Sequence, residues 1–341
     1  MNLISTHTFD NTNLSLPTNA VIGVESEVLV SAINCTLPSE QLQLIAPENS
    51  ISKYIHAALA DNTRKGYQSD LDHFLIWGGC IPASAEQVSQ YLVAYAELLS
   101  PATLSRRVVS INRAHTSRSM ESPTKSDLVK TTLRGIKRIV STKQRQVEPV
   151  LKNNLLDMVA GLQGVKGCRD RALLLLGFAG AFRRSELVGL QHSDIEFVEQ
   201  GLVVHLRKSK TDQEGQGRKI AIPYARGSVC PVLALKSWLK VSEIIEGALF
   251  RPVTRHGRIE KATLSTQAVA IIVKERAKAV GLDDSKFSGH SLRAGLVTSA
   301  AQAGVASWKI RQQTGHKSDA MLNRYIRDAR LFIDNVAGAI L

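Results

Sequence analysis

Residues 288–297 read SGHSLRAGLV, in which a polar turn at Ser288 and Gly289 leads into apolar residues at helical spacing. If this stretch is helical, His290 and Arg293 share one face because they are three positions apart. A histidine and an arginine at this spacing arise often by chance, so the pair alone is weak evidence of a site. Two further clusters, one on each side of it in the chain, strengthen the evidence.

The cluster that follows is Thr314-Gly315-His316, where the glycine is expected to end a helix. Ser318 is a candidate N-cap for a last helix that carries Tyr325, nine positions after the histidine. A tyrosine at such a position is most often a half-buried surface residue. It becomes a candidate nucleophile only in combination with the other clusters.

The cluster that precedes lies where an apolar helix ends in Gly180-Ala181-Phe182-Arg183-Arg184-Ser185-Glu186-Leu187. A guanidinium at such a place is costly to bury unless a partner neutralises it. An ion pair between Arg183 and Glu186, three residues on, is the simplest explanation of this pattern.

Two short runs downstream, Gly201–Leu206 and Lys219–Pro223, predict strands joined by a long polar loop that contains Lys208 and Lys210. The chain around this hairpin is expected to be helical, with earlier helices near Asn153–Leu162 and Arg169–Ala181. The second half of the chain is therefore predicted to be α-helical with a small antiparallel sheet.

The first half, from Ser52 to about Val140, has a helical pattern. The stop signals that separate its candidate helices are Asn62, Gly78-Gly79, Ser100-Pro101 and Ser122-Pro123. The second candidate helix has one apolar stripe, made by Tyr67, Leu71, Phe74 and Leu75. The third opens with Ser84 and Gln87 at capping-box spacing and continues with Val88, Tyr91, Leu92 and Tyr95.

Composition indicates a polyanionic partner. The 341 residues are 44% hydrophobic, enough for a buried core, and carry a formal charge of +13. Five acidic and no basic residues occur in the first 50, so 43 basic residues face 25 acidic ones in the rest. Nucleic acid is the first candidate, and a generically basic surface is the alternative. The side chains predicted to contact DNA are Arg106, Arg107, Arg113, Arg118, Lys130, Arg134, Lys137, Arg138 and Lys208.

Other classes of site are not indicated. Cys35, Cys80, Cys168 and Cys230 are scattered without a C-x-x-C pair, so neither a zinc site nor a disulfide framework is expected. No phosphate-binding or dinucleotide fingerprint occurs, so no cofactor is expected. No stretch reaches the roughly 18 apolar residues of a membrane span. We expect an intracellular, cytoplasmic protein without a membrane partner.

Taken in order, the clusters form one set: Arg183, Lys210, His290, Arg293, His316 and Tyr325. With it, the chain from about residue 50 to the end resembles the tyrosine recombinase (phage integrase) family, particularly its Cre-type members. Two positions differ from the residues that are common in the family. Arg184 follows the first arginine, where an apolar residue is frequent, and Ala294 follows the second, where histidine is common. Neither removes a catalytic group, and the spacing to Glu186 favours Arg183 over Arg184.

The resemblance implies a two-domain DNA clamp, mainly α with a small antiparallel sheet. Its parts would be a flexible acidic arm at 1–48, a helical core-binding (SAM-like) domain at 49–142, a linker at 143–150 and a mixed α/β catalytic domain at 151–341. Double-stranded DNA would lie between the domains. The apolar tail from Leu331 would dock on a neighbouring protomer and give a tetramer on two DNA sites, or, alternatively, fold back on its own domain.

The resemblance also implies the chemistry. Tyr325 would attack phosphorus to form a 3′-phosphotyrosine, with Arg183 and Arg293 holding the phosphate oxygens, without metal or ATP. Lys210 would protonate the departing 5′-oxygen, with Lys208 as the competing candidate. His290 would donate to the phosphate or take the tyrosine proton, His316 would add a donor, and Glu186 would orient the site.

Two rivals to this interpretation remain open from the sequence. One is a catalytically silent DNA-binding protein of the same fold, and the other is a type IB topoisomerase that relaxes DNA by the same chemistry. The complete set of six residues favours an enzyme, and the core-binding-like first domain and apolar tail favour recombination.

Overall fold

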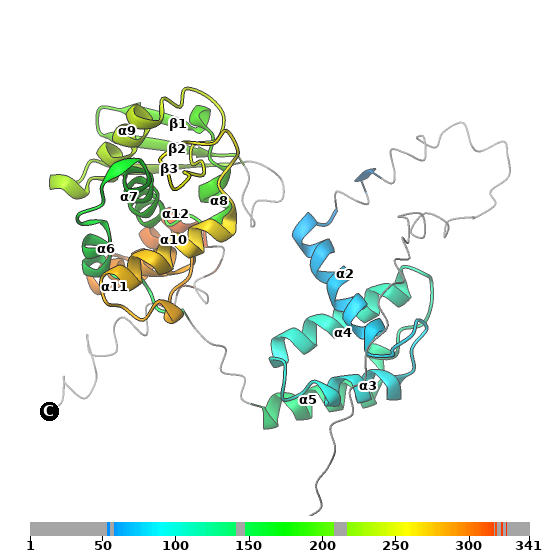
Figure 1. Cartoon of the computed structure of the whole chain (residues 1–341). Helices are drawn as coiled ribbons and strands as arrows, with labels where there is room; N and C mark the ends of the chain where they lie inside the picture. The colour runs from blue at the N-terminus through cyan, green and yellow to red at the C-terminus, as the bar shows by residue number, and fades with distance from the viewer. Residues whose placement is uncertain are drawn as a thin grey trace, which may run out of the picture. The chain divides into compact units, whose positions relative to one another are not determined.

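The computed structural model describes residues 53–54, 58–140, 147–207, 217–316, 318, 322 and 325. The acidic arm, the apolar tail, Lys208 and Lys210 lie outside these residues. The chain falls into two compact units, Met1–Gln144 and Arg145–Leu341, and each is described by itself (Figure 1). Within the described residues, every helix is too short or too polar to cross a membrane.

The described part of the first unit is helical: α2 (Asp61–Ile76), α3 (Ala85–Ala94), α4 (Pro101–Thr116) and α5 (Asp127–Ile139). Serine side chains begin three of these helices by accepting backbone N–H groups that have no partner within a helix. Ser84 accepts from the N–H of Gln87 at 3.2 Å, and Ser100 and Ser126 cap α4 and α5 in the same way. Gln87 turns its side chain to the N–H of Cys80 at 3.4 Å, so only half of the predicted capping box forms.

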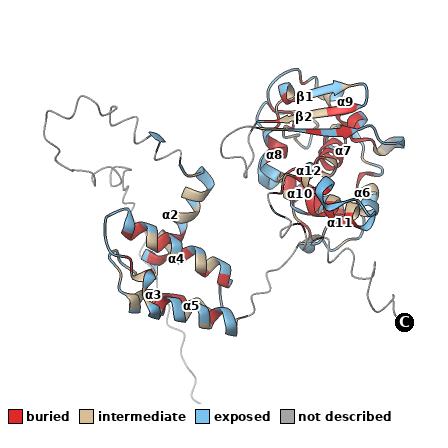
Figure 2. Ribbon diagram, turned by 180° about the vertical axis from the view of Figure 1, so that it is seen from behind, coloured by how far each residue is buried: buried red, intermediate tan, exposed pale blue. Residues whose placement is uncertain are grey.

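The core of the first unit lies where α2 packs on α4 and α3 packs on α5. Phe74, Tyr91 and Leu104 are fully buried there, as Figure 2 shows for the inner faces of these helices. Two expectations were wrong. Asn62 lies in the first turn of α2 and does not end a helix, because asparagine is tolerated in a first turn. Leu75 is 43% exposed, because one step along a helix turns a side chain about 100° away from its neighbour.

The second unit contains more helices and a sheet. Its elements are α6 (Lys152–Val159), α7 (Gly164–Ala179), α8 (Arg184–Gly189), β1 (Ile195–Val198), β2 (Gly201–Leu206), β3 (Arg218–Pro223), α9 (Pro231–Ser242), α10 (Thr266–Ala279), α11 (Ser291–Gln302) and α12 (Ser307–Thr314). The sheet and α9 lie at one end of this unit, α7 lies in the middle, and α6, α10 and α11 lie at the other end (Figure 1). The prediction of a mainly α fold with a small antiparallel sheet is confirmed.

The sheet has the order β1-β2-β3, and both pairs are antiparallel. Val204 faces Ile220 across the second pair, and both side chains are buried in the core of this unit. The sequence predicted β2 and β3 but no separate β1, whose four residues alternate little between buried and exposed. Because β3 begins one residue earlier than expected, Arg218 belongs to the sheet.

Helix α7 is the centre of the second unit. Leu173, Leu174 and Leu176 are fully buried on different faces of it, which requires neighbours all round. Helix α9 packs on one side of α7 and α11 on another. At its end the chain turns through Ala181, which has a left-handed φ of 49°. This turn places the residues after α7 beside α11.

The backbone of residues 147–150 runs along α11. The N–H of Val150 donates to the carbonyl of Ser291 at 2.9 Å, and Val150 is fully buried. A Cβ on Gly295 would lie 1.9 Å from the carbonyl oxygen of Val150, so only glycine permits this approach. The last residues of the proposed linker thus pair with the second unit.

Candidate active site

Glu186 holds Arg183 at the start of α8. The carboxylate accepts the backbone N–H of Arg183 at 2.9 Å through Oε2 and its Nη1 at 2.6 Å through Oε1. Glu186 is 6% exposed, and its partner's side chain is 19% exposed. A buried carboxylate that takes both groups fixes the direction of the guanidinium. This geometry supports the predicted orienting role of Glu186.

Arg293, in the first turn of α11, is 2% exposed. Its Nη1 donates to the carbonyl of Ala181 at 2.7 Å, which the left-handed turn after α7 directs toward it. Burial, together with the positive charge of Arg183, lowers the pKa of Arg293 to about 10. The guanidinium therefore remains protonated at neutral pH, and its charge is held where little water can solvate it.

His316 follows Gly315, the residue that ends α12, and is 8% exposed. Its Nε2 lies 3.2 Å from Nη2 of Arg293. An arginine only donates, so Nε2 accepts, and Nδ1–H donates to Oγ1 of Thr314 at 2.7 Å. Burial and then the charges of Arg293 and Arg183 lower the pKa of His316 to about 4. His316 is thus neutral. The predicted donation from His316 to a phosphate requires its bond to Arg293 to open.

His290 and Tyr325 form a pair, with 2.9 Å between Nε2 of His290 and the phenol oxygen. Partial burial of the ring and then the charges of Arg293 and Arg183 lower the pKa of His290. A neutral imidazole can accept the phenol proton, so the geometry favours that role over donation to phosphate. Tyr325 is half-buried and packs against a small apolar cluster made by Val297, Ala301, Ile310 and Leu322.

The five catalytic candidates that the structure describes converge although they lie far apart in the chain: Arg183, His290, Arg293, His316 and Tyr325. The charge of Tyr325 in its ionised form raises the pKa of Arg293, which places the phenol within electrostatic reach of that guanidinium. The adjacent Arg184 is exposed, and its side chain packs against Gly289. A Cβ added to Gly289 would lie 2.2 Å from Cδ of Arg184. It is therefore Arg183, and not Arg184, that Glu186 directs.

Sequence reasoning missed Arg218. Its side chain is 20% exposed, its Nη1 donates to the carbonyl of Gln313 at 3.0 Å, and its Nη2 is 3.9 Å from Oε2 of Glu186. Its charge lowers the pKa values of Arg293 and His316, so it belongs to the same cluster. The only signal in the sequence was an arginine at the edge of a predicted strand, which is common on any protein.

The predicted DNA contacts in the first unit lie on α4 and α5. On α5, Lys130, Arg134, Lys137 and Arg138 are exposed. The first three lie three or four positions apart and so share one face. On α4, Arg106 and Arg113 are exposed, and so is Arg118, two residues after this helix ends. Arg113 lies over the ring of Tyr67, 5.4 Å from its centre.

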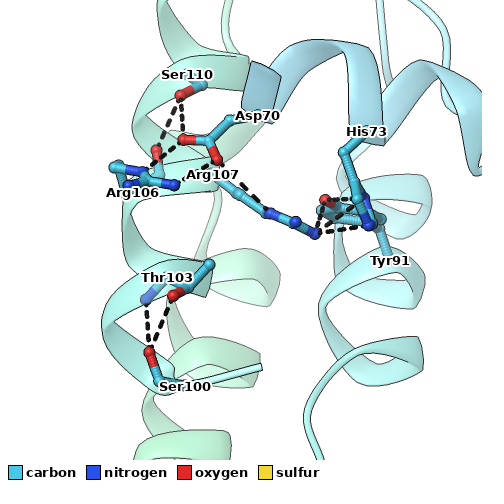
Figure 3. Close-up of polar contacts among 8 residues, drawn as sticks. All are labelled: Asp70, His73, Tyr91, Ser100, Thr103, Arg106, Arg107 and Ser110. Atoms are coloured by element: carbon cyan, nitrogen blue, oxygen red, sulfur yellow. Dashed lines mark hydrogen bonds and ion pairs between the residues drawn. The ribbon is translucent and has the colours of Figure 1, made fainter. Parts of the chain in front are cut away.

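Arg107 differs from these residues, because it is buried in the first unit (Figure 3). Its Nη1 donates to the hydroxyl of Tyr91 at 2.7 Å and lies 2.9 Å from Nδ1 of His73. Asp70 accepts Arg106 through two bonds at 2.7 and 2.8 Å and lies 3.7 Å from Nε of Arg107. The structure thus gives Arg107 a place in the core, where it does not face a phosphate.

Lys210 and Lys208, the candidates for the general acid, lie outside the described residues. Within the described part of the chain, no three His, Cys, Asp or Glu side chains are grouped in a way that could hold a metal ion. The cationic side chains that the described residues bring together here are those of Arg183, Arg218 and Arg293.

Known proteins share this arrangement of elements. Residues 148–330 match the model of the phage integrase family. The chain is 41% identical over 290 residues to an integrase/recombinase XerD homologue of Selenomonas ruminantium. The aligned residues cover 81% of this chain and 84% of the relative. The fold is similar to that of the Tn1549 transposon integrase in complex with transposon right end DNA, with a TM-score of 0.58, 18% identity, and coverage of 82% of this chain and 95% of that one. It is also similar to a lambda integrase tetramer bound to a Holliday junction, with a TM-score of 0.56, 20% identity, and coverage of 82% and 75%.

Proposed function

Because the chain belongs to the phage integrase family of tyrosine recombinases, we propose that it cuts and rejoins DNA at specific sites with Tyr325 as the nucleophile. The observation that carries this assignment is the 2.9 Å contact between the phenol of Tyr325 and Nε2 of His290. It supports the proposal because the phenol lies beside an imidazole whose pKa is lowered and within electrostatic reach of the buried guanidinium of Arg293. A phenol has a pKa near 10, so it needs both groups to attack at neutral pH.

In the proposed step, the Tyr325 oxygen forms a bond to phosphorus as the bond from phosphorus to the 5′-oxygen breaks. His290 takes the phenol proton, and Lys210 gives a proton to the departing oxygen. Arg183 and Arg293 stabilise the charge on the non-bridging oxygens with planar forks that a lysine cannot reproduce. The 3′-phosphotyrosine preserves the energy of the ester, and a 5′-hydroxyl from a partner strand reverses the step.

The first test is covalent trapping. A suicide DNA substrate, from which the cleaved strand diffuses away, should give a covalent protein–DNA band on a denaturing gel. Tyr325→Phe should abolish the band and keep DNA binding, because only the hydroxyl is lost. If the native chain gives no band with any DNA that it binds, the proposal of a catalytically silent binder takes its place.

A second test separates recombination from relaxation of a single DNA. A plasmid with two copies of the bound sequence should yield deletions or inversions. Relaxed circles without exchange between sites would instead identify the topoisomerase activity.

We also propose that duplex DNA contacts the exposed basic face of α5 together with Arg106 and Arg113 of α4 and with Arg118, which follows α4. Support comes from the charge of this segment and from the spacing of Lys130, Arg134 and Lys137. Arg107 is left out of this surface because it is buried. Lys208 stays among the candidates on the basis of its charge alone.

Assembly into a tetramer on two DNA sites is proposed from the apolar tail, and the lambda integrase tetramer on a Holliday junction is a precedent for the fold. Deleting residues 331–341 should preserve binding to one site and abolish the paired complex in native gel electrophoresis. A truncated chain that still pairs two DNA sites would show that the tail serves its own protomer.

A further inference from the structure

Arg218 lies between two parts of the candidate active site. It opens β3, and its guanidinium reaches the carbonyl of Gln313, next to the end of α12, at 3.0 Å and the carboxylate of Glu186 at 3.9 Å. Gln313 is 95 residues away in the sequence. One side chain therefore connects the sheet, the start of α8 and the end of α12.

The contact with Gln313 caps a helix. The last carbonyls of a helix have no partner within it, and a cation at this end is favoured by both hydrogen bonding and the helix dipole. Helix α12 ends at Thr314, and Gly315 takes a left-handed φ of 67°. The side chain of Gln313 ties the same turn to the carbonyl of Ala179 at 2.9 Å. Arg218 supplies the charged partner at this end.

Gly315 and Arg218 also fit each other in space. A Cβ on Gly315 would lie 2.6 Å from Nη1 of Arg218 and 2.8 Å from its Cζ. The glycine thus leaves room for the guanidinium, and the guanidinium limits where the glycine can move. The next residue along the chain is His316, whose Nε2 accepts from Arg293 at 3.2 Å.

The other face of Arg218 is turned toward Glu186. Its Nη2 is buried and makes no hydrogen bond within the described structure, and the carboxylate 3.9 Å away is the anion facing it. Burial and the charge of Arg183 lower the pKa of Arg218, and Glu186 opposes them. Arg218 is thus bound to the end of α12 through Nη1, and its Nη2 faces the carboxylate of Glu186.

We propose that Arg218 is a positioning residue for DNA cleavage, which caps α12 and thereby holds His316 against Arg293. This role rests on the proposed function, because it matters only if Arg293 binds the reacting phosphate. A loss of the cap should release the turn that carries His316, so the imidazole should no longer lie beside Arg293, where it can move from that guanidinium to a bound phosphate. The defect should then appear in the rate of cleavage and not in the affinity for DNA.

The test is a double-mutant cycle in the full-length chain, with Arg218→Ala, His316→Ala and the double variant. Covalent complex formation is measured in a single turnover on the suicide substrate. Loss of one positioning contact should slow cleavage about 10- to 100-fold with DNA affinity changed less than about threefold. If Arg218 acts through His316, its removal from the His316→Ala chain should slow cleavage by less than about threefold more. Effects that multiply would overturn the proposal.

Arg207 is the matched control. It follows β2 at the other side of the same hairpin, its side chain is 65% exposed, and it pairs with Asp194 at 2.6 Å. Arg207→Ala removes the same charge from the hairpin and should leave cleavage within about twofold of the native rate. A native rate in Arg218→Ala, with the native chain and the control both cleaving, would overturn the positioning role alone. Absence of cleavage by the native chain would overturn the proposed function.

A second variant covers the case in which Arg218→Ala does not fold. Arg218→Lys keeps the positive charge but lacks the planar fork that spans Gln313 and Glu186. If charge alone matters, this variant cleaves at the native rate, and the proposal is overturned. A rate at least about fivefold below native, at an unchanged melting temperature, supports it.

Discussion

Replacing Glu186 with glutamine tests whether one buried carboxylate organises the site. Glutamine has the same shape and keeps an oxygen that can accept the N–H of Arg183, but it lacks the charge. In the native chain this charge faces Arg183 at 2.6 Å and Arg218 at 3.9 Å. Glu186→Gln therefore leaves three guanidiniums, those two and Arg293, without an anion among them.

The expected cost follows from burial. Removing one partner of a buried ion pair costs about 3–5 kcal/mol, because the remaining charge is left without compensation. The Arg183 side chain is 19% exposed and regains some hydration, and the amide oxygen still accepts one bond. We therefore expect a loss of about 2–3 kcal/mol in the free energy of unfolding. Without the carboxylate, the guanidinium of Arg183 is no longer held in one direction. Covalent complex formation should slow by about 100-fold, as expected when an active-site group is slightly misplaced.

The measurement is urea unfolding followed by the fluorescence of Trp238, which is buried in the same unit, together with single-turnover cleavage. The control is Glu275→Gln, because Glu275 pairs with Lys166 at 3.3 Å and both side chains are about half exposed. An exposed pair contributes about 0–1 kcal/mol and touches nothing in the site. If Glu186→Gln unfolds and cleaves like this control, then Glu186 does not organise the arginines and the reasoning is refuted.

Three further outcomes are expected. Gly295→Ala should lower the free energy of unfolding by about 1–3 kcal/mol or more, measured against Gly66→Ala, because its Cβ would meet a backbone oxygen at 1.9 Å whereas Gly66 has open space. The pKa of His316 is about 4 in the folded chain and 6.5 in the unfolded chain, so the unfolded chain binds the proton first as the pH falls. The free energy of unfolding should therefore fall by about 3 kcal/mol between pH 6.5 and pH 4. In His316→Gln this loss should be smaller. The double variant Lys130→Ala, Arg134→Ala should release about two fewer ions on binding DNA, measured as the slope of log affinity against log salt in a filter-binding titration. An unchanged slope would show that DNA does not contact this face of α5.

The catalytic candidates could be predicted because individually weak clusters occur in one order along the chain, and this set resembles the tyrosine recombinase family. His290 and Arg293 lie three positions apart, and Tyr325 follows His316 by nine. What the sequence could not show was direction. Neighbouring helix positions point about 100° apart, so Arg106 reaches Asp70 from the surface while Arg107 enters the core. A count of basic residues treats the two alike.

Contacts between distant segments were equally hidden. Arg218 acquires its partners only when β3 pairs with β2 and α12 lies beside the sheet. The first strand of the sheet, β1, was missed for a related reason, because none of its four residues is buried and they lack a clear alternation. Local pattern specifies elements well where one face is buried, and it says little where a residue takes its role from a remote partner.

The site concentrates like charges at some cost to the folded state. Three guanidiniums surround one carboxylate, and the two histidines beside them stay neutral because burial and these cations lower their pKa values. In the free protein, Nη2 of Arg293 donates a hydrogen bond to Nε2 of His316. A phosphate that entered would offer Arg293 an anionic acceptor in place of a neutral one, so the exchange of partners favours the bound state. The freed imidazole of His316 would then lie beside the new charge, which favours its protonated form and turns an acceptor into the donor that the reaction needs.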